Sequence, residues 1–234
     1  MVLTDEMLNK LKGQGFILNR NKETFSLRIV TGYGVVTPQF LHTVADAAEK
    51  FGCRMIGLTS RLGFELTGIR PEDADAVEKY LSERGILTGG TGPRIRPIVA
   101  CKGAVCRFGL HDTWALGQKL HERFYIGWHD VALPAKFKIG VGGCPNNCIK
   151  PQLNDFSIVG AAAGEKCVKI FIGGKYGRKW RQGDELGGLY SHDEALEILE
   201  KALHYYKDNA NPKERFGDMI DRLGLETVRK ALLS

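Results

Sequence analysis

The chain lacks several features that mark whole classes of protein. Its 234 residues include no apolar run near the roughly 20 residues that a membrane-spanning helix needs, and residues 1–13 lack the apolar core of a secretory signal. The formal charge of +6 comes without a long Lys/Arg block, which favours a small anionic ligand over nucleic acid. We therefore expect a globular protein of the cytoplasm without a nucleic-acid partner.

Motifs for nicotinamide or flavin binding are missing as well. Gly32-Tyr33-Gly34 lacks the third glycine of a dinucleotide-binding loop, and the glycines of residues 140–143 lead into a cysteine instead. If the protein catalyses a redox reaction, its electrons must come from a separate donor.

The six cysteines are few, and four of them form two pairs. In a reducing cytoplasm their spacing argues for metal or redox chemistry over disulfides. Each pair follows an apolar run, and if Pro145 opens a helix, one turn presents both thiols of the second pair beside backbone N–H groups. Four thiolates suit an iron–sulfur cluster, with structural zinc as the alternative. The pairs are Cys101 with Cys106, and Cys144 with Cys148.

Glycines around the paired cysteines favour the cluster over zinc, because they leave backbone N–H groups free to hydrogen-bond its sulfides. Cys53 and Cys167 stand alone in apolar runs, so we expect them to be buried thiols that act as small hydrophobes.

Hydrophobic periodicity predicts an α+β fold in two parts, divided in the glycine-rich segment 85–94. Helices are expected over residues 1–15, 37–51, 71–85, 105–124, 191–207, 212–222 and 224–233. Strands are expected over residues 24–31, 55–59, 63–69, 95–100, 136–142, 156–161 and 167–173. The polar loop of residues 173–188 is too long for a simple connection, which predicts that it covers a ligand.

Cationic side chains lie in the strands that lead to the cysteines. Lys136 and Lys138 are two residues apart and share a face, and Arg94 and Arg96 repeat this spacing before the first cysteine pair. Arg28 stands in an apolar strand of the first part. These cations predict a basic pocket for a small oxyanion, a polycarboxylate cofactor or both, with a solvated strand edge as the alternative.

Taken in order, these motifs resemble the siroheme-dependent sulfite and nitrite reductases, and most closely their low-molecular-weight, assimilatory-type members from anaerobes. The resemblance covers about residues 20–225. It rests on Cys-x4-Cys, Lys-Phe-Lys and Gly-Gly-Cys-Pro-Asn-Asn-Cys-x-Lys-Pro, with Leu58-Thr59-Ser60-Arg61 upstream and Gly-Gly-Lys-Tyr-Gly-Arg at residues 173–178. It implies an N-terminal arm and a ferredoxin-like α/β sandwich unit over residues 1–90. A siroheme- and 4Fe-4S-binding α+β unit with C-terminal helices would follow over residues 91–234.

The resemblance also implies roles for individual residues. The four paired cysteines would hold a 4Fe-4S cluster, and Cys148 would also ligate the siroheme iron. The substrate-binding cations of the family match Arg28, Arg96, Lys136 and Lys138. Siroheme contacts would come from Arg61, with Asn146, Asn147 and Arg178 as weaker matches.

Some positions depart from the family pattern. Relatives commonly have five residues between the first two cysteines where this chain has four, and Lys150 and Gly57 stand where arginines are usual. Larger members contain two copies of the ferredoxin-like plus cluster-binding unit, and this chain has one. Either a homodimer or the 173–188 loop and N-terminal arm must then complete the siroheme pocket.

The implied reaction is the six-electron reduction of sulfite to sulfide, with electrons from an external donor such as a ferredoxin. Reduction of nitrite to ammonia is the chemically parallel alternative, and the four cations favour sulfite. An alternative from another class is a non-catalytic siroheme and iron–sulfur electron-transfer subunit.

Overall fold

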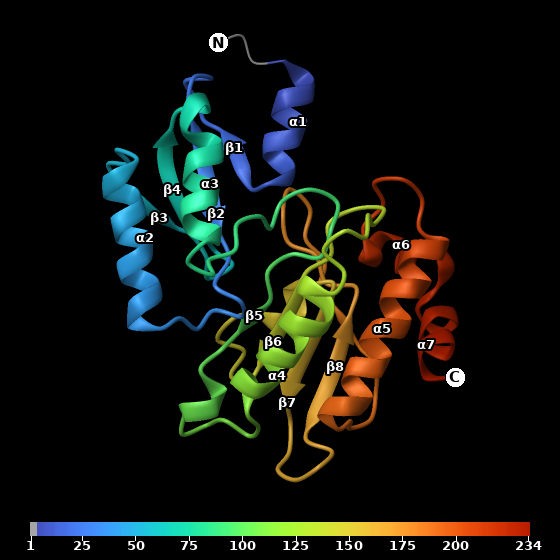
Figure 1. Cartoon of the computed structure of the whole chain (residues 1–234). Helices are drawn as coiled ribbons and strands as arrows, with labels where there is room; N and C mark the ends of the chain where they lie inside the picture. The colour runs from blue at the N-terminus through green and yellow to red at the C-terminus, as the bar shows by residue number, and fades with distance from the viewer. Residues whose placement is uncertain (1–3) are drawn as a thin grey trace. The chain divides into compact units, whose positions relative to one another are not determined.

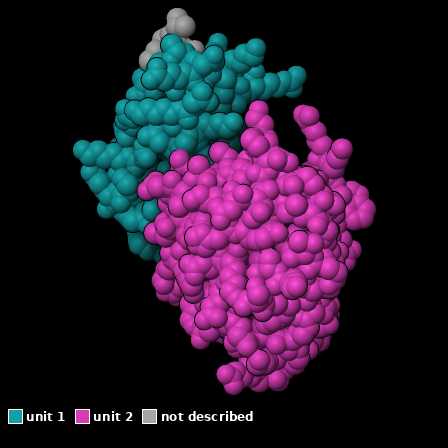
Figure 2. All heavy atoms as spheres, turned by 90° about the vertical axis from the view of Figure 1, so that its right-hand side faces the viewer, with its two compact units in different colours: residues 1–92 teal, residues 93–234 magenta. Residues whose placement is uncertain are grey.

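The chain divides into two compact units, Met1–Gly92 and Pro93–Ser234, which are coloured separately in Figure 2. The computed structural model describes residues 4–234. The division falls within the glycine-rich segment, and each unit has its own sheet. Across the described residues, no helix combines the length and apolar character that crossing a bilayer requires.

The first unit is an antiparallel sheet with helices on one face (Figure 1). The strands, in spatial order, are β1 (Phe16–Leu18), β2 (Phe25–Ile29), β4 (Phe64–Ile69) and β3 (Ile56–Leu58). The helices are α1 (Asp5–Gly13), α2 (Pro38–Lys50) and α3 (Ala74–Ser82), the last preceded by a 3₁₀ turn at Pro71–Asp73.

Strand alternation separates the two faces of this sheet. Phe25, Leu27 and Ile29 of β2 join the buried core with side chains of α2 and α3, so Ser26 and Arg28 point to the opposite face. The capped start of α2 is confirmed, since Thr37 accepts a hydrogen bond from Phe40 N at 3.2 Å. Strand β1 was not predicted, because three residues are too short for a visible alternation. The helix expected over residues 1–15 is confirmed as α1, and residues 1–3 lie outside the described part of the chain.

The second unit is a mixed five-stranded sheet with the order β5-β6-β7-β8-β9. Strands β5 to β7 are parallel, and β8 and β9 are antiparallel to their neighbours. Helix α4 packs on β5 and β6, and three helices close the chain (Figure 1). The strands are β5 (Val99–Ala100), β6 (Ile139–Gly142), β7 (Phe156–Gly160), β8 (Val168–Ile172) and β9 (Asp184–Glu185). The helices are α4 (Thr113–Leu120), α5 (His192–Asn209), α6 (Phe216–Leu223) and α7 (Leu225–Leu233), with a π-helical turn at His121–Ile126 after α4 and 3₁₀ turns at Gly103–Val105 and Pro151–Leu153.

These elements confirm the α+β fold class and correct two helix predictions. The helix expected from residue 105 begins at Thr113, because the Asp112 side chain accepts from Trp114 N and Ala115 N and caps it there. No helix begins at Pro145. That segment forms turns, since Asn147 has a φ of 59° and leaves the right-handed helical region.

Candidate cofactor and anion site

Two neighbouring parallel strands carry the two cysteine loops. Val99 of β5 pairs with Gly140 of β6, Ala100 pairs with Val141, and Cys101 N donates to Val141 O at 3.0 Å. Because the carboxyl ends of parallel strands meet at one edge of a sheet, the loop that begins at Cys101 lies beside the loop that follows β6.

Close backbone contacts lock the loops together. Gly143 N donates to Cys101 Sγ at 3.1 Å, and a Cβ at Gly143 would lie 2.7 Å from Gly103 Cα. Thr113 Oγ1 donates to Cys101 O at 2.7 Å and accepts from Ala104 N at 3.2 Å. Glycine is therefore required at position 143, and one cysteine sulfur already accepts a backbone N–H, as cluster ligands do.

The second cysteine loop is open to a bound group. Cys148 is exposed, and Cys144 is half-buried. Asn147 Oδ1, between them, is buried without a hydrogen-bond partner among the described residues, and such an atom marks a place where a ligand can complete the hydrogen bonding. Four thiols on two adjacent loops suit an iron–sulfur cluster. Within residues 4–234, no three His, Cys, Asp or Glu side chains gather tightly enough to hold a single metal ion.

The cations of the second unit share one face of the chain leading to these loops. Ile95 and Phe137 form a parallel bridge, with Arg96 N donating to Phe137 O at 2.8 Å, and both bridge residues are buried. Successive side chains of extended chain point to opposite faces, so we expect the residues that flank this bridge to lie on the face opposite its two buried side chains. The flanking residues are Arg94, Arg96, Lys136 and Lys138.

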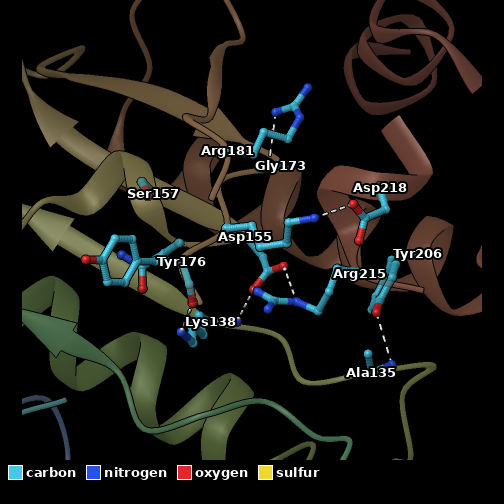
Figure 3. Close-up of polar contacts among 12 residues, drawn as sticks. Ala135, Lys138, Asp155, Ser157, Gly173, Tyr176, Arg181, Tyr206, Arg215 and Asp218 are labelled. Carbon is cyan, nitrogen blue, oxygen red and sulfur yellow. Dashed lines mark hydrogen bonds and ion pairs between the residues drawn. The ribbon is translucent and has the colours of Figure 1, made fainter. Parts of the chain in front are cut away.

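A buried ion pair fixes the position of Lys138 (Figure 3). Lys138 N donates to Asp155 Oδ2 at 2.8 Å, and Arg215 donates to the two Asp155 oxygens at 2.6 and 3.2 Å. The Asp155 side chain is 0% exposed, and that of Arg215 is 11% exposed. Burial raises the pKa of the Asp155 carboxyl, and the Arg215 guanidinium opposes this shift. Lys138 Nζ is oriented by a long 3.4 Å contact to Tyr176 O.

Within the 173–188 loop, residues 175–181 form a hairpin and Asp184–Glu185 form β9. Lys175 and Arg181 exchange two backbone hydrogen bonds of 2.8 Å, and their side chains form ion pairs with Asp218 and Asp221, respectively. These contacts leave residues 176–180 as an exposed tip. The tip carries Arg178, one of the predicted siroheme contacts.

Two predicted site residues belong to the first unit, which is described by itself. Arg28 of β2 forms an ion pair with Glu65 of β4, in which Nε lies 2.7 Å from Oε1. Arg61 is half-buried in the turn before β4, and its N–H donates to Thr59 Oγ1 at 3.3 Å. Within the second unit, the segments that carry Arg96, Lys136 and Lys138 therefore lie beside each other, whereas Arg28 and Arg61 belong to the first unit.

The sequence analysis missed Asp155 and Arg215. The only signal was an acidic residue at the start of an apolar strand, because its cationic partner lies 60 residues further along the chain. Of the two lone cysteines, Cys167 is buried and Cys53 is half-buried against the first core, and burial raises the pKa of both thiols.

Comparison with known proteins identifies both units. Residues 91–234 match the Nitrite and sulphite reductase 4Fe-4S domain, and residues 17–84 match the Nitrite/Sulfite reductase ferredoxin-like half domain. The domain matched by residues 91–234 is described as a 4Fe-4S domain, which supports an iron–sulfur cluster over structural zinc.

Relatives of known sequence include both kinds of reductase. The chain is 34% identical to an assimilatory-type sulfite reductase from Nitratidesulfovibrio vulgaris, over 94% of this chain and 97% of that protein. It is also 31% identical to a nitrite reductase [NAD(P)H] from Bacillus subtilis, over 85% of this chain but 24% of that protein.

Solved structures show the same fold. The crystal structure of dissimilatory sulfite reductase I matches 90% of this chain and 69% of that chain with a TM-score of 0.78 at 16% identity. The NirA protein of Mycobacterium tuberculosis matches 98% of this chain and 46% of that chain with a TM-score of 0.84 at 17% identity. The chain belongs to the nitrite and sulfite reductase family, whose cofactors are siroheme and a 4Fe-4S cluster.

Proposed function

We propose that the protein reduces sulfite to sulfide by six electrons, which a separate one-electron carrier such as a ferredoxin supplies. The observation that carries the proposal is the bridge between Ile95 and Phe137 before β6, which sets Arg96, Lys136 and Lys138 on neighbouring segments that lead to the cysteine loops. When bound, siroheme supplies an iron with an open position for the substrate, and the cluster supplies electrons singly.

The cofactors are assigned to the residues of the two cysteine loops and their surroundings. The cluster takes the four paired thiols, and Cys148, the most exposed of them, is shared with siroheme. The siroheme carboxylates and ring edge are assigned to Arg61, Asn146, Asn147 and Arg178.

The cations bind the anion and provide protons. Lys136 and Lys138 neutralise developing charge on the substrate oxygens, and each Nζ can donate a proton as an S–O bond breaks. Arg96 and Arg28 hold the oxyanion through paired N–H groups. Glu65 competes with the anion for Arg28, so we expect Arg28 to contribute to affinity more than to the bond-breaking steps.

Sulfite is preferred because the assimilatory-type sulfite reductase is matched over almost its whole length. Nitrite reduction to ammonia is the second candidate, supported by the Bacillus subtilis relative. Since the chain has one ferredoxin-like unit, we further propose that it works as a homodimer.

Turnover of sulfite and of nitrite by the cofactor-loaded protein, with a reduced viologen dye as donor, tests the proposal. We expect faster turnover of sulfite than of nitrite. Lys138→Met should lower the maximal sulfite rate on the order of 10²-fold with cofactor content unchanged, because one charge-assisted contact is lost. Arg28→Met should mainly raise the sulfite concentration for half-maximal rate.

Lys201→Met, an exposed lysine of α5, is the matched control and should behave like the parent. Parent-like sulfite turnover by both Lys138→Met and Arg28→Met would show that the cationic face is not the active site. Faster nitrite than sulfite turnover would transfer the assignment to the second candidate.

A further inference from the structure

Two histidines form a hydrogen-bonded pair next to Gly142, the last residue of β6. His111 lies just before α4, and His192 is the first residue of α5. His111 Nε2 is 3.0 Å from Gly142 O, and His111 Nδ1 is 3.0 Å from His192 Nε2. The rings meet edge to face with centroids 5.0 Å apart.

The contacts fix the direction of each hydrogen bond. A carbonyl oxygen only accepts, so His111 Nε2 must carry the hydrogen and donate to Gly142 O. In the neutral ring, His111 Nδ1 is then an acceptor, and His192 Nε2–H donates to it. Burial lowers the pKa of both imidazoles, which favours these neutral forms.

The hydrogen-bonded chain continues through the backbone to a cysteine. Gly142 C=O and Gly143 N–H belong to the same peptide group, and this N–H donates to Cys101 Sγ at 3.1 Å. Donation by His111 to the carbonyl polarises the peptide, and a polarised peptide is a stronger N–H donor. The chain therefore runs from His192 through His111 and the 142–143 peptide to Cys101.

His111 is closely packed on the side that faces Gly143 and Gly160. A Cβ at Gly160 would overlap Gly143 O and lie 2.8 Å from His111 Cδ2. Leu110 N donates to Gly143 O at 2.9 Å and holds the histidine-bearing segment against the second cysteine loop. The imidazole of His111 is therefore fixed in position.

We propose that His111 and His192 set the reduction potential of the 4Fe-4S cluster by strengthening the hydrogen bond from Gly143 N–H to Cys101. The inference rests on the assignment of Cys101 as a cluster ligand. A hydrogen bond to a ligand sulfur stabilises the reduced cluster, which carries the additional negative charge, and thereby raises its potential. Both residues act on the cluster through the peptide, so they are positioning residues.

The test is a redox titration of the cluster in the cofactor-loaded protein, monitored by electron paramagnetic resonance. In His111→Leu, the ratio of reduced to oxidised cluster at fixed potential should fall about two- to fivefold, if a charge-assisted hydrogen bond loses about 10–30% of its strength. This is a shift of about 18 to 41 mV to more negative values, at 59 mV per tenfold for one electron. His192→Leu should shift the potential in the same direction by less.

Two variants make the test specific. His111→Gln places an amide N–H donor near the former Nε2 and should restore most of the potential. His204→Leu, on the exposed face of α5, makes the same chemical change outside the chain of hydrogen bonds and should leave the potential unchanged.

An unchanged potential in His111→Leu overturns the proposal, and so does an equal shift in His111→Gln or His204→Leu. If His111→Leu fails to incorporate the cluster, His192→Leu decides, because it leaves the Gly142 contact in place. These potentials are measured without substrate, so the proposed sulfite reduction can fail while the histidine effect stands.

Discussion

Replacing Arg215 with methionine should destabilise the protein in a pH-dependent way. The change keeps the aliphatic stem but removes the guanidinium that pairs with Asp155, whose side chain is 0% exposed. Breaking a buried pair by removing one partner typically costs about 3 to 5 kcal/mol, because the other charge is left uncompensated.

The size of the effect follows from the alternative open to Asp155, which is to take up a proton. With an ordinary aspartate pKa of about 3.9 and about 1.36 kcal/mol per pH unit, protonation at pH 7 costs at most about 4 kcal/mol. At about pH 5 the same cost is only about 1.5 kcal/mol. The folded variant then binds a proton that the unfolded chain lacks, so its stability falls as pH rises above about 4.

Urea unfolding of the cofactor-loaded parent and variant, followed by circular dichroism at several pH values between about 5 and 8, measures this difference. The deficit of Arg215→Met should grow with pH. The double variant Asp155→Asn/Arg215→Met removes both charges, so its own stability should lack the pH dependence that a buried carboxyl group at position 155 contributes. A deficit of Arg215→Met that is equal at all pH values would refute the argument from the buried carboxylate.

Other measurements test separate parts of the structure. Cys148→Ser should lose the cluster and uncouple any remaining siroheme from it, whereas Cys53→Ser should keep the parent's iron content and visible spectrum; a parent-like spectrum in Cys148→Ser contradicts the shared ligand. Gly160→Ala should lower the free energy of unfolding by about 1 to 3 kcal/mol, because its methyl group meets Gly143 O. Thermal melts measure this loss, and Gly177→Ala, with open space around it, is the control. Light scattering should show self-association, and a mass of only about 26 kDa at micromolar concentration counts against the homodimer.

Much of the fold, including the strands that lead to the paired cysteines, could be predicted from local patterns. Thr37-Pro38 marked the start of a helix, and the apolar runs before Cys101 and Cys144 marked the strands that lead to these cysteines. The same spacing argument placed Lys136 and Lys138 on one face, in agreement with the buried Phe137 between them. These features depend on residues within a few positions of one another, which is the range that periodicity reports.

The features that escaped prediction depend on distant partners or on backbone conformation. Asp155 and Arg215 are 60 residues apart, and His111 and His192 are 81 apart, so no local pattern joins them. The prediction of a helix that begins at Pro145 was wrong for a different reason. A proline is compatible with the first position of a helix but does not show that a helix follows. Here Asn147 adopts a left-handed conformation, which interrupts a helix and which the proline does not predict.

The parallel pairing of β5 with β6 links cofactor binding to the register of these two strands. Cys101 and Cys144 lie far apart in the chain, and they come together because Val99 pairs with Gly140 and Ala100 with Val141. A slip of one residue would shift Cys101 by about 3.3 Å and turn the side chains of β5 to the opposite face. The unfolded chain does not hold these thiols together, so under the proposed ligand assignment, insertion of the cluster favours the native pairing. If the paired cysteines hold the cluster as proposed, a variant that shifts this register should lose iron.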